Sequence, residues 1–493
     1  MPALAAALLV FLSSAAVLVL EILAARLLAP YVGDTLEVYT AIIGTILAGI
    51  AFGSWWGGRW ADRRDPNTLI GPLLIAGGGL SFLTIPLVDL LGTGMRGANA
   101  LTTVVLTFTA FFAPAAVLTA VTPAVIKLQL ADLDETGRVV GRLSAIGTAG
   151  AIIGTFFTGF LLVAAAPTRP SIRFVGVFLV LLGIGTLVWL RGTRSAVSAT
   201  MVVAIVAAGA LSFAARHPCD HESAYYCARV EVDPERPTGR ALWLDTLRHS
   251  YVDVEDPTHL EFTYTQWFGD AITAVAPDGE ALRTLHVGGG GFTMPQYLRV
   301  SNPGSTSTVL EVDPLLVELS RDELGLELRD DIEVLTGDAR LTAPRVDAGA
   351  YDLVINDAFG GVSVPWHLAT VEFLTQVEGA LDDEGVVVTN VIDYADRDFL
   401  RAYLATTAAV FDSVAIIGRE DALGPTVPGL GGNFVVLASD AALPVDELLA
   451  ANRARGQVDD VLHGTDLRDF VGDAPVLTDD FAPVDQLLTP LPQ

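Results

Sequence analysis

The sequence predicts two structural classes in one chain: an α-helical bundle of about seven transmembrane helices, followed by a doubly wound α/β domain. Two observations lead to this prediction. The mean hydropathy of +0.51 over 493 residues is too high for a fully soluble protein. The charge is also unevenly divided, because residues 1–216 carry 13 Lys and Arg against 9 Asp and Glu, whereas the rest carries 16 against 48.

The first 216 residues contain seven apolar stretches, each close to the roughly 20 residues that cross a bilayer core. They are 3–24, 38–57, 68–90, 98–122, 143–165, 172–190 and 196–214. Pro114 and Pro123 are expected to kink or break the fourth stretch. Small residues in 49–53 and 150–154 favour close packing between helices. We therefore expect a multi-pass protein of the cell membrane, with the lipid bilayer as a partner.

Basic residues between the apolar stretches predict which side faces the cytoplasm. Eight lie on one side and four on the other; the eight are Arg59, Arg63, Arg64, Lys127, Arg138, Arg142, Arg191 and Arg194, and the four are Arg26, Arg96, Arg169 and Arg173. The richer side is expected to be cytoplasmic, so seven spans would place the following domain outside. That placement conflicts with a cytosolic nucleotide cosubstrate, and a span count of six would reverse it.

Two cysteines, Cys219 and Cys227, follow the last apolar stretch. They can form a disulfide, which an external location would favour, or remain two structural thiols. His217 and His221 lie nearby, but their spacing fits no zinc pattern, so no metal is expected.

The strongly acidic second part, at about −32, excludes nucleic acid as a partner, because phosphate binding requires a positive surface. Its carboxylates are spread along the chain, and Lys127 is the only lysine among the basic residues. Excess surface carboxylate keeps a protein hydrated in strong salt. We therefore expect a salt-adapted organism, with an acidic binding face as the alternative.

From about residue 225 the pattern changes to short β-rich runs that alternate with helical ones, which is typical of a parallel sheet with crossover helices. The expected strands are 225–232, 240–254, 283–287, 307–312, 332–336, 351–356, 385–391, 412–418 and 433–438, with helices at 314–324 and 367–381. The predicted division is a transmembrane domain at 1–216, a juxtamembrane segment with a small β region at 217–280, and a Rossmann-like domain at 281–493.

A nucleotide site is predicted at the carboxyl ends of these strands. Gly288, Gly289, Gly290 and Gly291 follow the first strand of the Rossmann-like domain, and such a glycine run lets backbone N–H groups approach a nucleotide. Glu311 ends the next strand and can accept hydrogen bonds from both ribose hydroxyls. Asp313 stands before Pro314 and is interpreted as a helix cap.

Acidic residues also follow the third and fourth strands. Asp338 can accept a hydrogen bond from the amine of an adenine, and Asp357 ends the fourth strand. Because the carboxyl ends of parallel strands meet at one crevice, these carboxylates and the glycines are expected to form one site.

This ordered series resembles the spermidine synthase family, the polyamine aminopropyltransferases. Residues 242–250 resemble the L-D-G-x-x-Q-S hairpin of that family, and residues 261–266 its E-F-x-Y-H-E segment. The apolar front, with residues 57–63 and 478–485, resembles its membrane-embedded branch, in which a major-facilitator-like part is fused to a spermidine synthase. The resemblance implies decarboxylated S-adenosylmethionine as cosubstrate, a small-molecule amine as acceptor, and no metal.

The resemblance also implies a role for each site residue. Gly288 to Gly290 would pass beneath the cosubstrate, Glu311 would hold its ribose and Asp338 its adenine. Asp357 would be the catalytic base, and Tyr264 would orient the amine.

Two carboxylates of the family pattern are replaced in this sequence. Gly360 stands where a second aspartate follows the base, and Gln266, a candidate substrate-binding residue, replaces a glutamate. A diamine dication would need counter-charge there, so putrescine is in doubt as the acceptor.

Two other functions remain open. A methyltransferase of the same fold would use S-adenosylmethionine itself, with His286 or Thr293 meeting its carboxylate. An amine transporter or sensor would use the helices, and Glu21 is its candidate cation ligand, although a position near the end of its span lets it reach the interface. The oligomeric state, a homodimer included, stays open.

Overall fold

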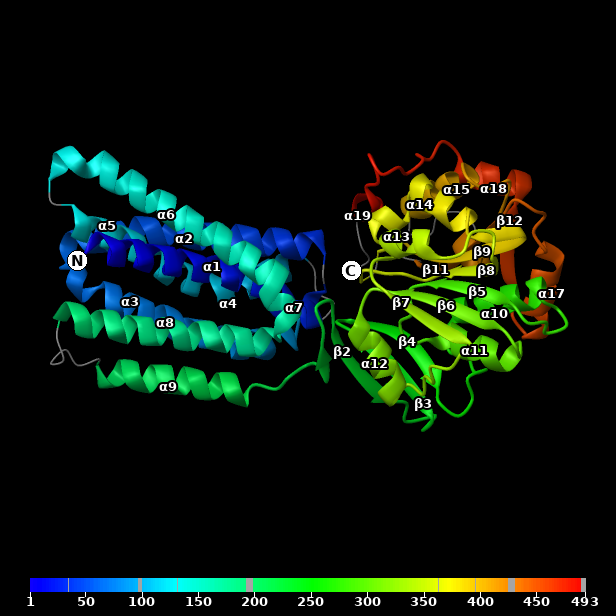
Figure 1. Cartoon of the computed structure of the whole chain (residues 1–493), viewed down its shortest axis with the longest axis horizontal. Helices are drawn as coiled ribbons and strands as arrows, with labels where there is room; N and C mark the ends of the chain where they lie inside the picture. The colour runs from blue at the N-terminus through cyan, green and yellow to red at the C-terminus, as the bar shows by residue number, and fades with distance from the viewer. Residues whose placement is uncertain are drawn as a thin grey trace. The chain divides into compact units, whose positions relative to one another are not determined.

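The computed structural model describes residues 1–33, 35–95, 100–130, 132–191, 198–361, 363–394, 396–423 and 431–488. Contacts divide the chain into two compact units, Met1–Cys227 and Ala228–Gln493 (Figure 1). Residues 217–227 thus group with the helices, whereas the sequence placed them with the small β region. Arg96 and Arg194, two residues of the charge count, lie outside the described residues.

The first unit is a helical bundle. Its helices are α1 (Ala3–Val32), α2 (Leu36–Arg63), α3 (Ile70–Gly92), α4 (Ala100–Thr119), α5 (Val121–Gln129), α6 (Thr136–Phe157), α7 (Val163–Ala165), α8 (Thr168–Arg191) and α9 (Ala199–Ala214). In the described part of the chain, six spans are long and apolar enough to cross a membrane. Helix α9 has 16 residues and reaches about 24 Å, which is less than the roughly 30 Å of a hydrocarbon core.

One helix boundary differs from the prediction, and one predicted break is confirmed. Helix α1 continues to Val32, so Glu21 lies well inside the helix and not near its end. The fourth apolar stretch is divided at Ala120, between α4 and α5. Pro123 has no N–H to donate to the carbonyl of Thr119, which explains the interruption.

Glycines allow the helices to pack closely, as the sequence predicted. A Cβ atom on Gly49 of α2 would lie 2.8 Å from the side chain of Ala115 in α4. A Cβ atom on Gly154 of α6 would lie 2.8 Å from the carbonyl oxygen of Ala15 in α1. Larger side chains at these positions would push the helices apart.

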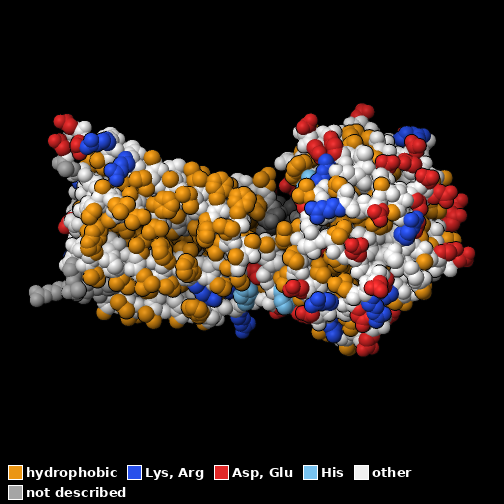
Figure 2. All heavy atoms as spheres, in the orientation of Figure 1, with side chains coloured by type: hydrophobic (Ala, Val, Ile, Leu, Met, Phe, Trp, Pro, Cys, Tyr) orange, Lys and Arg blue, Asp and Glu red, His pale blue; other side chains and the backbone are white. Residues whose placement is uncertain are grey.

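The outer surface of the helices is apolar, whereas that of the second unit is rich in carboxylates. Figure 2 shows hydrophobic side chains over the helices and many Asp and Glu side chains on the second unit. Phe160 and Val203, for example, expose 76% and 66% of their surface. Apolar exposure of this extent marks a surface that meets lipid or another protein.

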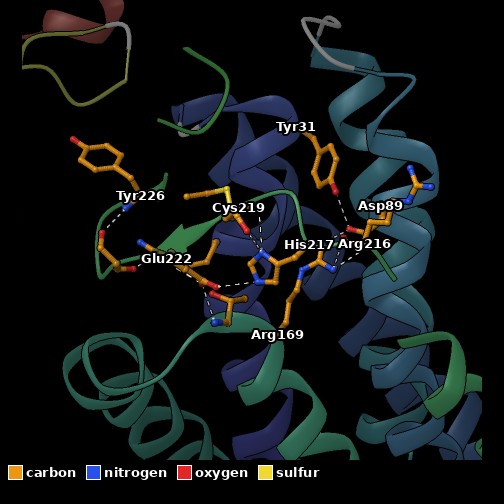
Figure 3. Close-up of a disulfide and its surroundings, with 12 residues drawn as sticks. Tyr31, Asp89, Arg169, Arg216, His217, Cys219, Glu222 and Tyr226 are labelled. Carbon is orange, nitrogen blue, oxygen red and sulfur yellow. Dashed lines mark hydrogen bonds and ion pairs between the residues drawn. A yellow bond between two sulfur atoms is a disulfide. The ribbon is translucent and has the colours of Figure 1, made fainter. Parts of the chain in front are cut away.

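The segment that follows α9 is fixed to one end of the helices (Figure 3). Cys219 and Cys227 form a disulfide, the first of the two alternatives left open for them. Buried Arg169 of α8 pairs with Asp89 of α3 and donates a hydrogen bond to the carbonyl oxygen of Arg216 at 2.9 Å. Residue 216, the end of α3 and the start of α8 therefore lie together.

Two further contacts hold the same segment. The backbone N–H of Thr168 donates to the Glu222 carboxylate at 2.8 Å, and Arg26 of α1 donates to the carbonyl oxygens of Ser223 and Ala224. The end of α1 thus lies at this same end of the bundle.

The second unit begins with antiparallel strands β2 (Cys227–Val232), β3 (Gly239–Leu244) and β4 (Leu247–Asp253). An eight-stranded sheet follows, in the order β12-β10-β11-β9-β8-β5-β6-β7. Its strands are β5 (Arg283–Val287), β6 (Thr306–Glu311), β7 (Ile332–Thr336), β8 (Tyr351–Asn356), β9 (Leu381–Asp393), β10 (Ser413–Arg419), β11 (Gly432–Ser439) and β12 (Asp459–His463). Strands β5 to β9 pair in parallel, and β10 to β12 add an antiparallel edge.

Helices cover both faces of this sheet, which confirms the doubly wound α/β architecture (Figure 1). One face carries α10 (Thr263–Val275), α11 (Thr293–Ser301) and α17 (Val445–Ala454). The other carries α13 (Ala339–Thr342), α14 (Val371–Glu378), α15 (Asp398–Ala408) and α18 (Gly464–Val471). The short helices α16 (Glu420–Leu423) and α19 (Val484–Leu487) and helix α12 (Pro314–Glu323) complete the unit. The strand order reverses between β5 and β8, where doubly wound sheets bind ligands.

Candidate functional site

The glycine loop after β5 has a backbone that requires glycine. Gly288 and Gly290 have φ angles of +91° and +49°. A Cβ atom on Gly288 would also lie 2.9 Å from the carbonyl oxygen of Asp357, which follows β8. The loop therefore passes directly beside the end of β8, and without side chains its backbone leaves room for a ligand to approach closely.

Glu311, at the end of β6, holds this loop in place. Its Oε2 accepts hydrogen bonds from the N–H groups of Gly289 at 2.8 Å and Gly290 at 3.1 Å, and its Oε1 accepts from Asp313 at 2.8 Å. Burial raises the pKa of Glu311, and the three N–H donors oppose that rise. A carboxylate has about four acceptor positions, so roughly one remains for a ligand hydroxyl.

Asp338, a second carboxylate of the expected nucleotide site, and Asp313 both cap helices. Asp338 caps α13 by accepting a hydrogen bond from Arg340 N at 2.8 Å, and its carboxylate lies 3.3 Å from His367 Nε2. Asp338 follows β7, the neighbour of strand β6 that Glu311 ends, and 39% of its side chain is exposed. Asp313 accepts a hydrogen bond from Leu315 N at 3.0 Å, which confirms that it caps α12.

A cavity of about 460 Å³ lies beside the glycine loop, and Asp357 and Tyr264 both line it. Its other walls include His249 of β4, Phe262, Asn390 of β9 and Tyr394. The proposed base and the proposed orienting tyrosine are thus brought together from segments almost 100 residues apart.

Asp357 has the electrostatic character of a base that works near neutral pH. Burial raises its pKa to about 7, and hydrogen bonds from Asn390 and Tyr264 oppose that rise. Asn390 Nδ2 donates to Oδ1 of Asp357 at 2.9 Å. Burial, together with the proximity of Asp357, raises the pKa of Tyr264 well above its usual value, so the hydroxyl remains protonated and can donate.

His249 lies between the glycine loop and the cavity. Its Nδ1 is buried without a hydrogen-bond partner among the described residues, and a Cβ atom on Gly290 would lie 3.5 Å from it. Burial lowers the pKa of His249 to about 4, so the ring is neutral. A ligand that extends from the glycine loop towards Asp357 would pass this nitrogen.

Gln266 does not line the cavity. Its Nε2 donates to the carbonyl oxygen of Leu260 at 2.8 Å, and its Oε1 accepts from Gln457 at 2.6 Å. The amide therefore joins α10 to neighbouring segments of the protein, whereas the family pattern suggested a contact with substrate.

The sequence analysis missed Asn390 and His249. Asn390 stands in the apolar run 386–392 of β9, and a buried amide in such a run is a signal that it has a polar partner. His249 stands between the polar residues Arg248 and Ser250 of a hairpin, and no pattern in the sequence distinguishes it from a surface histidine.

No family model matches the sequence. The chain is 28% identical over 172 residues to the polyamine aminopropyltransferase of Vibrio vulnificus. The aligned region covers 34% of this chain and 53% of that protein. It is 26% identical over 163 residues to the probable polyamine aminopropyl transferase of Bifidobacterium longum, with 33% and 35% covered. The bovine eEF1A lysine and N-terminal methyltransferase is 27% identical over 186 residues, with 36% and 26% covered.

Among solved structures, a probable spermidine synthase from Corynebacterium glutamicum matches with a TM-score of 0.48 and 26% identity, over 53% of this chain and 95% of that one. The chain spans about half or less of the length of the curated relatives it matches. These relatives are transferases. About a third of this chain is therefore similar in sequence to the polyamine aminopropyltransferases.

Proposed function

We propose that this chain is a membrane-bound transferase of the aminopropyltransferase type, which moves an aminopropyl group from decarboxylated S-adenosylmethionine to an amine. The observation that carries the proposal is Asp357, a carboxylate with a pKa of about 7 in a cavity beside the glycine loop. The similarity to polyamine aminopropyltransferases supports it.

In the proposed reaction, the amine nitrogen forms a bond to the propyl carbon next to the sulfonium. The bond from this carbon to sulfur breaks, its electrons pass to sulfur, and methylthioadenosine leaves as a neutral thioether. Asp357 accepts the proton that the ammonium must lose before its nitrogen can attack. Tyr264 and Asn390 hold the carboxylate in position through their hydrogen bonds.

The glycine loop and its neighbours fit the nucleoside half of this cosubstrate. Gly288 to Gly290 would pass beneath it, because their backbone leaves room for a close approach. The remaining acceptor position of Glu311 would meet a ribose hydroxyl, and the partly exposed Asp338 would meet the adenine amine. His249 Nδ1 is free to accept a hydrogen bond from the aminopropyl ammonium.

Methyl transfer from S-adenosylmethionine is the second candidate, and the similarity to the bovine methyltransferase favours it. That cosubstrate carries a carboxylate, for which His286 and Thr293 were the expected partners. His286 Nε2 instead lies 2.9 Å from the Thr284 hydroxyl, and the Thr293 hydroxyl donates to the carbonyl oxygen of Tyr251 at 3.1 Å. Their engagement within the protein favours the decarboxylated cosubstrate.

The helical unit is proposed to be embedded in a membrane, with α9 as a seventh, shorter span. An odd number of spans is supported by the contacts that bring the end of α1, the end of α3, the start of α8 and residues 216–224 together. The disulfide and the excess of basic residues at the opposite end both favour an external second unit. The excess of carboxylates on that unit favours a salt-adapted cell.

The experiment that tests this function separates binding from chemistry. On the full chain in detergent, Asp357→Asn should keep the affinity for methylthioadenosine within a few fold while turnover falls by about 10² to 10⁴. Asp383→Asn, which neutralises an exposed carboxylate on β9, is the matched control and should keep both. Full turnover by Asp357→Asn would reject the mechanism, and tighter binding of S-adenosylmethionine than of its decarboxylated form would favour methyl transfer.

A further inference from the structure

The acceptor cavity has the charge of a site for one ammonium group. Among the residues that the structure describes, Asp357 is the one carboxylate that lines it. A single negative charge balances a monoamine and leaves a diamine with one positive charge unpaired.

The only other charged side chain on the described wall is positive. Arg248 lies 3.3 Å from the carboxylate of Glu261, and its guanidinium lies over the rings of Tyr251 and Phe262 at 5.0 and 4.9 Å. Glu261 is therefore already paired with an arginine and does not line the cavity. A second ammonium in this cavity would meet the positive charge of Arg248 without a free carboxylate.

The remaining walls are suited to an apolar body. Phe262, Tyr264, Phe359, Ile392 and Tyr394 line the cavity together with the asparagines Asn390 and Asn433. The amide nitrogens of both asparagines are engaged, because Asn433 Nδ2 donates to Asn390 Oδ1 at 2.9 Å and Asn390 Nδ2 donates to Asp357 at 2.9 Å. An alkyl or aryl group would replace water on these aromatic faces, whereas an ammonium would lose its hydration there.

We propose that the acceptor is a primary monoamine with an apolar body. This inference rests on the proposed function and names its substrate class. The amino group would lie at Asp357 and the apolar body against the aromatic walls.

An isosteric pair of acceptors provides the test. 1-Aminopentane and 1,4-diaminobutane have the same length and differ only in a terminal methyl or ammonium group. The readout is release of methylthioadenosine from decarboxylated S-adenosylmethionine by the full chain in detergent. The expected kcat/KM is at least about tenfold higher for 1-aminopentane. The free-energy cost of an unpaired ammonium in a partly buried site exceeds the free energy that corresponds to a tenfold difference.

A second carboxylate should weaken the preference for 1-aminopentane. A Cβ atom on Gly360 would have no neighbour closer than 3.9 Å, and Gly360 precedes Gly361, which lines the cavity. Gly360→Asp should therefore lower the preference for 1-aminopentane by about tenfold. The isosteric but neutral Gly360→Asn should leave the preference unchanged, as should Gln266→Glu, because Gln266 lies outside the cavity wall.

Each outcome has one meaning. A wild-type preference for 1,4-diaminobutane would overturn the monoamine inference and leave the proposed function standing. A preference that Gly360→Asp and Gly360→Asn change equally would also overturn it, because charge would not be the cause. If no amine releases methylthioadenosine although the nucleoside binds, the proposed function itself fails.

Discussion

Removal of one hydroxyl group should move the pH at which this protein becomes active. Asp357 can accept a proton only when it is ionised, so kcat/KM should fall as the pH drops below the pKa of this residue. With a pKa of about 7, the acidic limb of the profile is expected near neutral pH and not near the usual range of a carboxyl group. Tyr264→Phe removes the donor whose hydrogen bond lowers this pKa.

The size of the shift follows from the strength of that hydrogen bond. A hydrogen bond to a charged group contributes about 1.5 to 3 kcal/mol, and one pKa unit corresponds to about 1.4 kcal/mol. Loss of the Tyr264 donor should therefore raise the pKa of Asp357 by about one to two units, because only the ionised form is stabilised by the donor. Activity at neutral pH should fall about five- to fiftyfold and recover at higher pH.

The assay is the initial rate of methylthioadenosine release as a function of pH, with one acceptor for all variants, so that titration of the acceptor cancels in the comparison. Tyr394→Phe is the matched control, since Tyr394 lines the same cavity and no hydrogen bond from it affects the pKa of Asp357. Its acidic limb should stay at the position of the wild type. A Tyr264→Phe profile that is lower at every pH but unshifted would refute the hydrogen-bond argument.

Two further predictions concern the nucleoside site and the disulfide. Glu311→Gln should weaken methylthioadenosine binding by about ten- to a hundredfold, because an amide has one acceptor oxygen for the N–H groups that now bond to two. The control Asp313→Asn conserves a good helix cap and should keep the affinity. Equal losses of affinity in both variants would contradict the role of Glu311. A membrane-impermeant thiol reagent should label Cys219 and Cys227 on intact cells only after reduction, whereas labelling only after lysis would place the second unit in the cytoplasm.

The sequence predicted most of the parallel sheet, because each of its strands is an apolar run that a glycine or an acidic residue ends. Strand β12 was missed, since Asp459-Asp-Val-Leu-His463 is largely polar and lies at the edge of the sheet, where one side needs no apolar partner. The helix expected at 367–381 is shorter, because Thr370 caps α14 by accepting a hydrogen bond from the N–H of Phe373. The start of α14 is set by the threonine cap, and the apolar periodicity of the sequence does not indicate this position.

The two halves of the candidate site differ in how far the sequence can predict them. The nucleoside half is local: Gly288 follows β5, Glu311 ends β6, and parallel pairing of these two strands brings the residues together. The sequence could therefore propose both residues, although not that Glu311 would use three of its acceptor positions to hold the loop.

The proposed acceptor half is assembled from five separate segments: β4, the start of α10, the end of β8, the second half of β9 and the start of β11. Contacts between these segments depend on packing and not on spacing in the sequence. The net charge of such a cavity cannot be read from the sequence. Glu261 is close to Tyr264 in the chain, but its carboxylate pairs with Arg248 and does not line the cavity. Only the folded chain shows that, among the described residues, Asp357 is the one carboxylate that lines this cavity. The choice between a monoamine and a diamine therefore depends on a property that only the folded chain has.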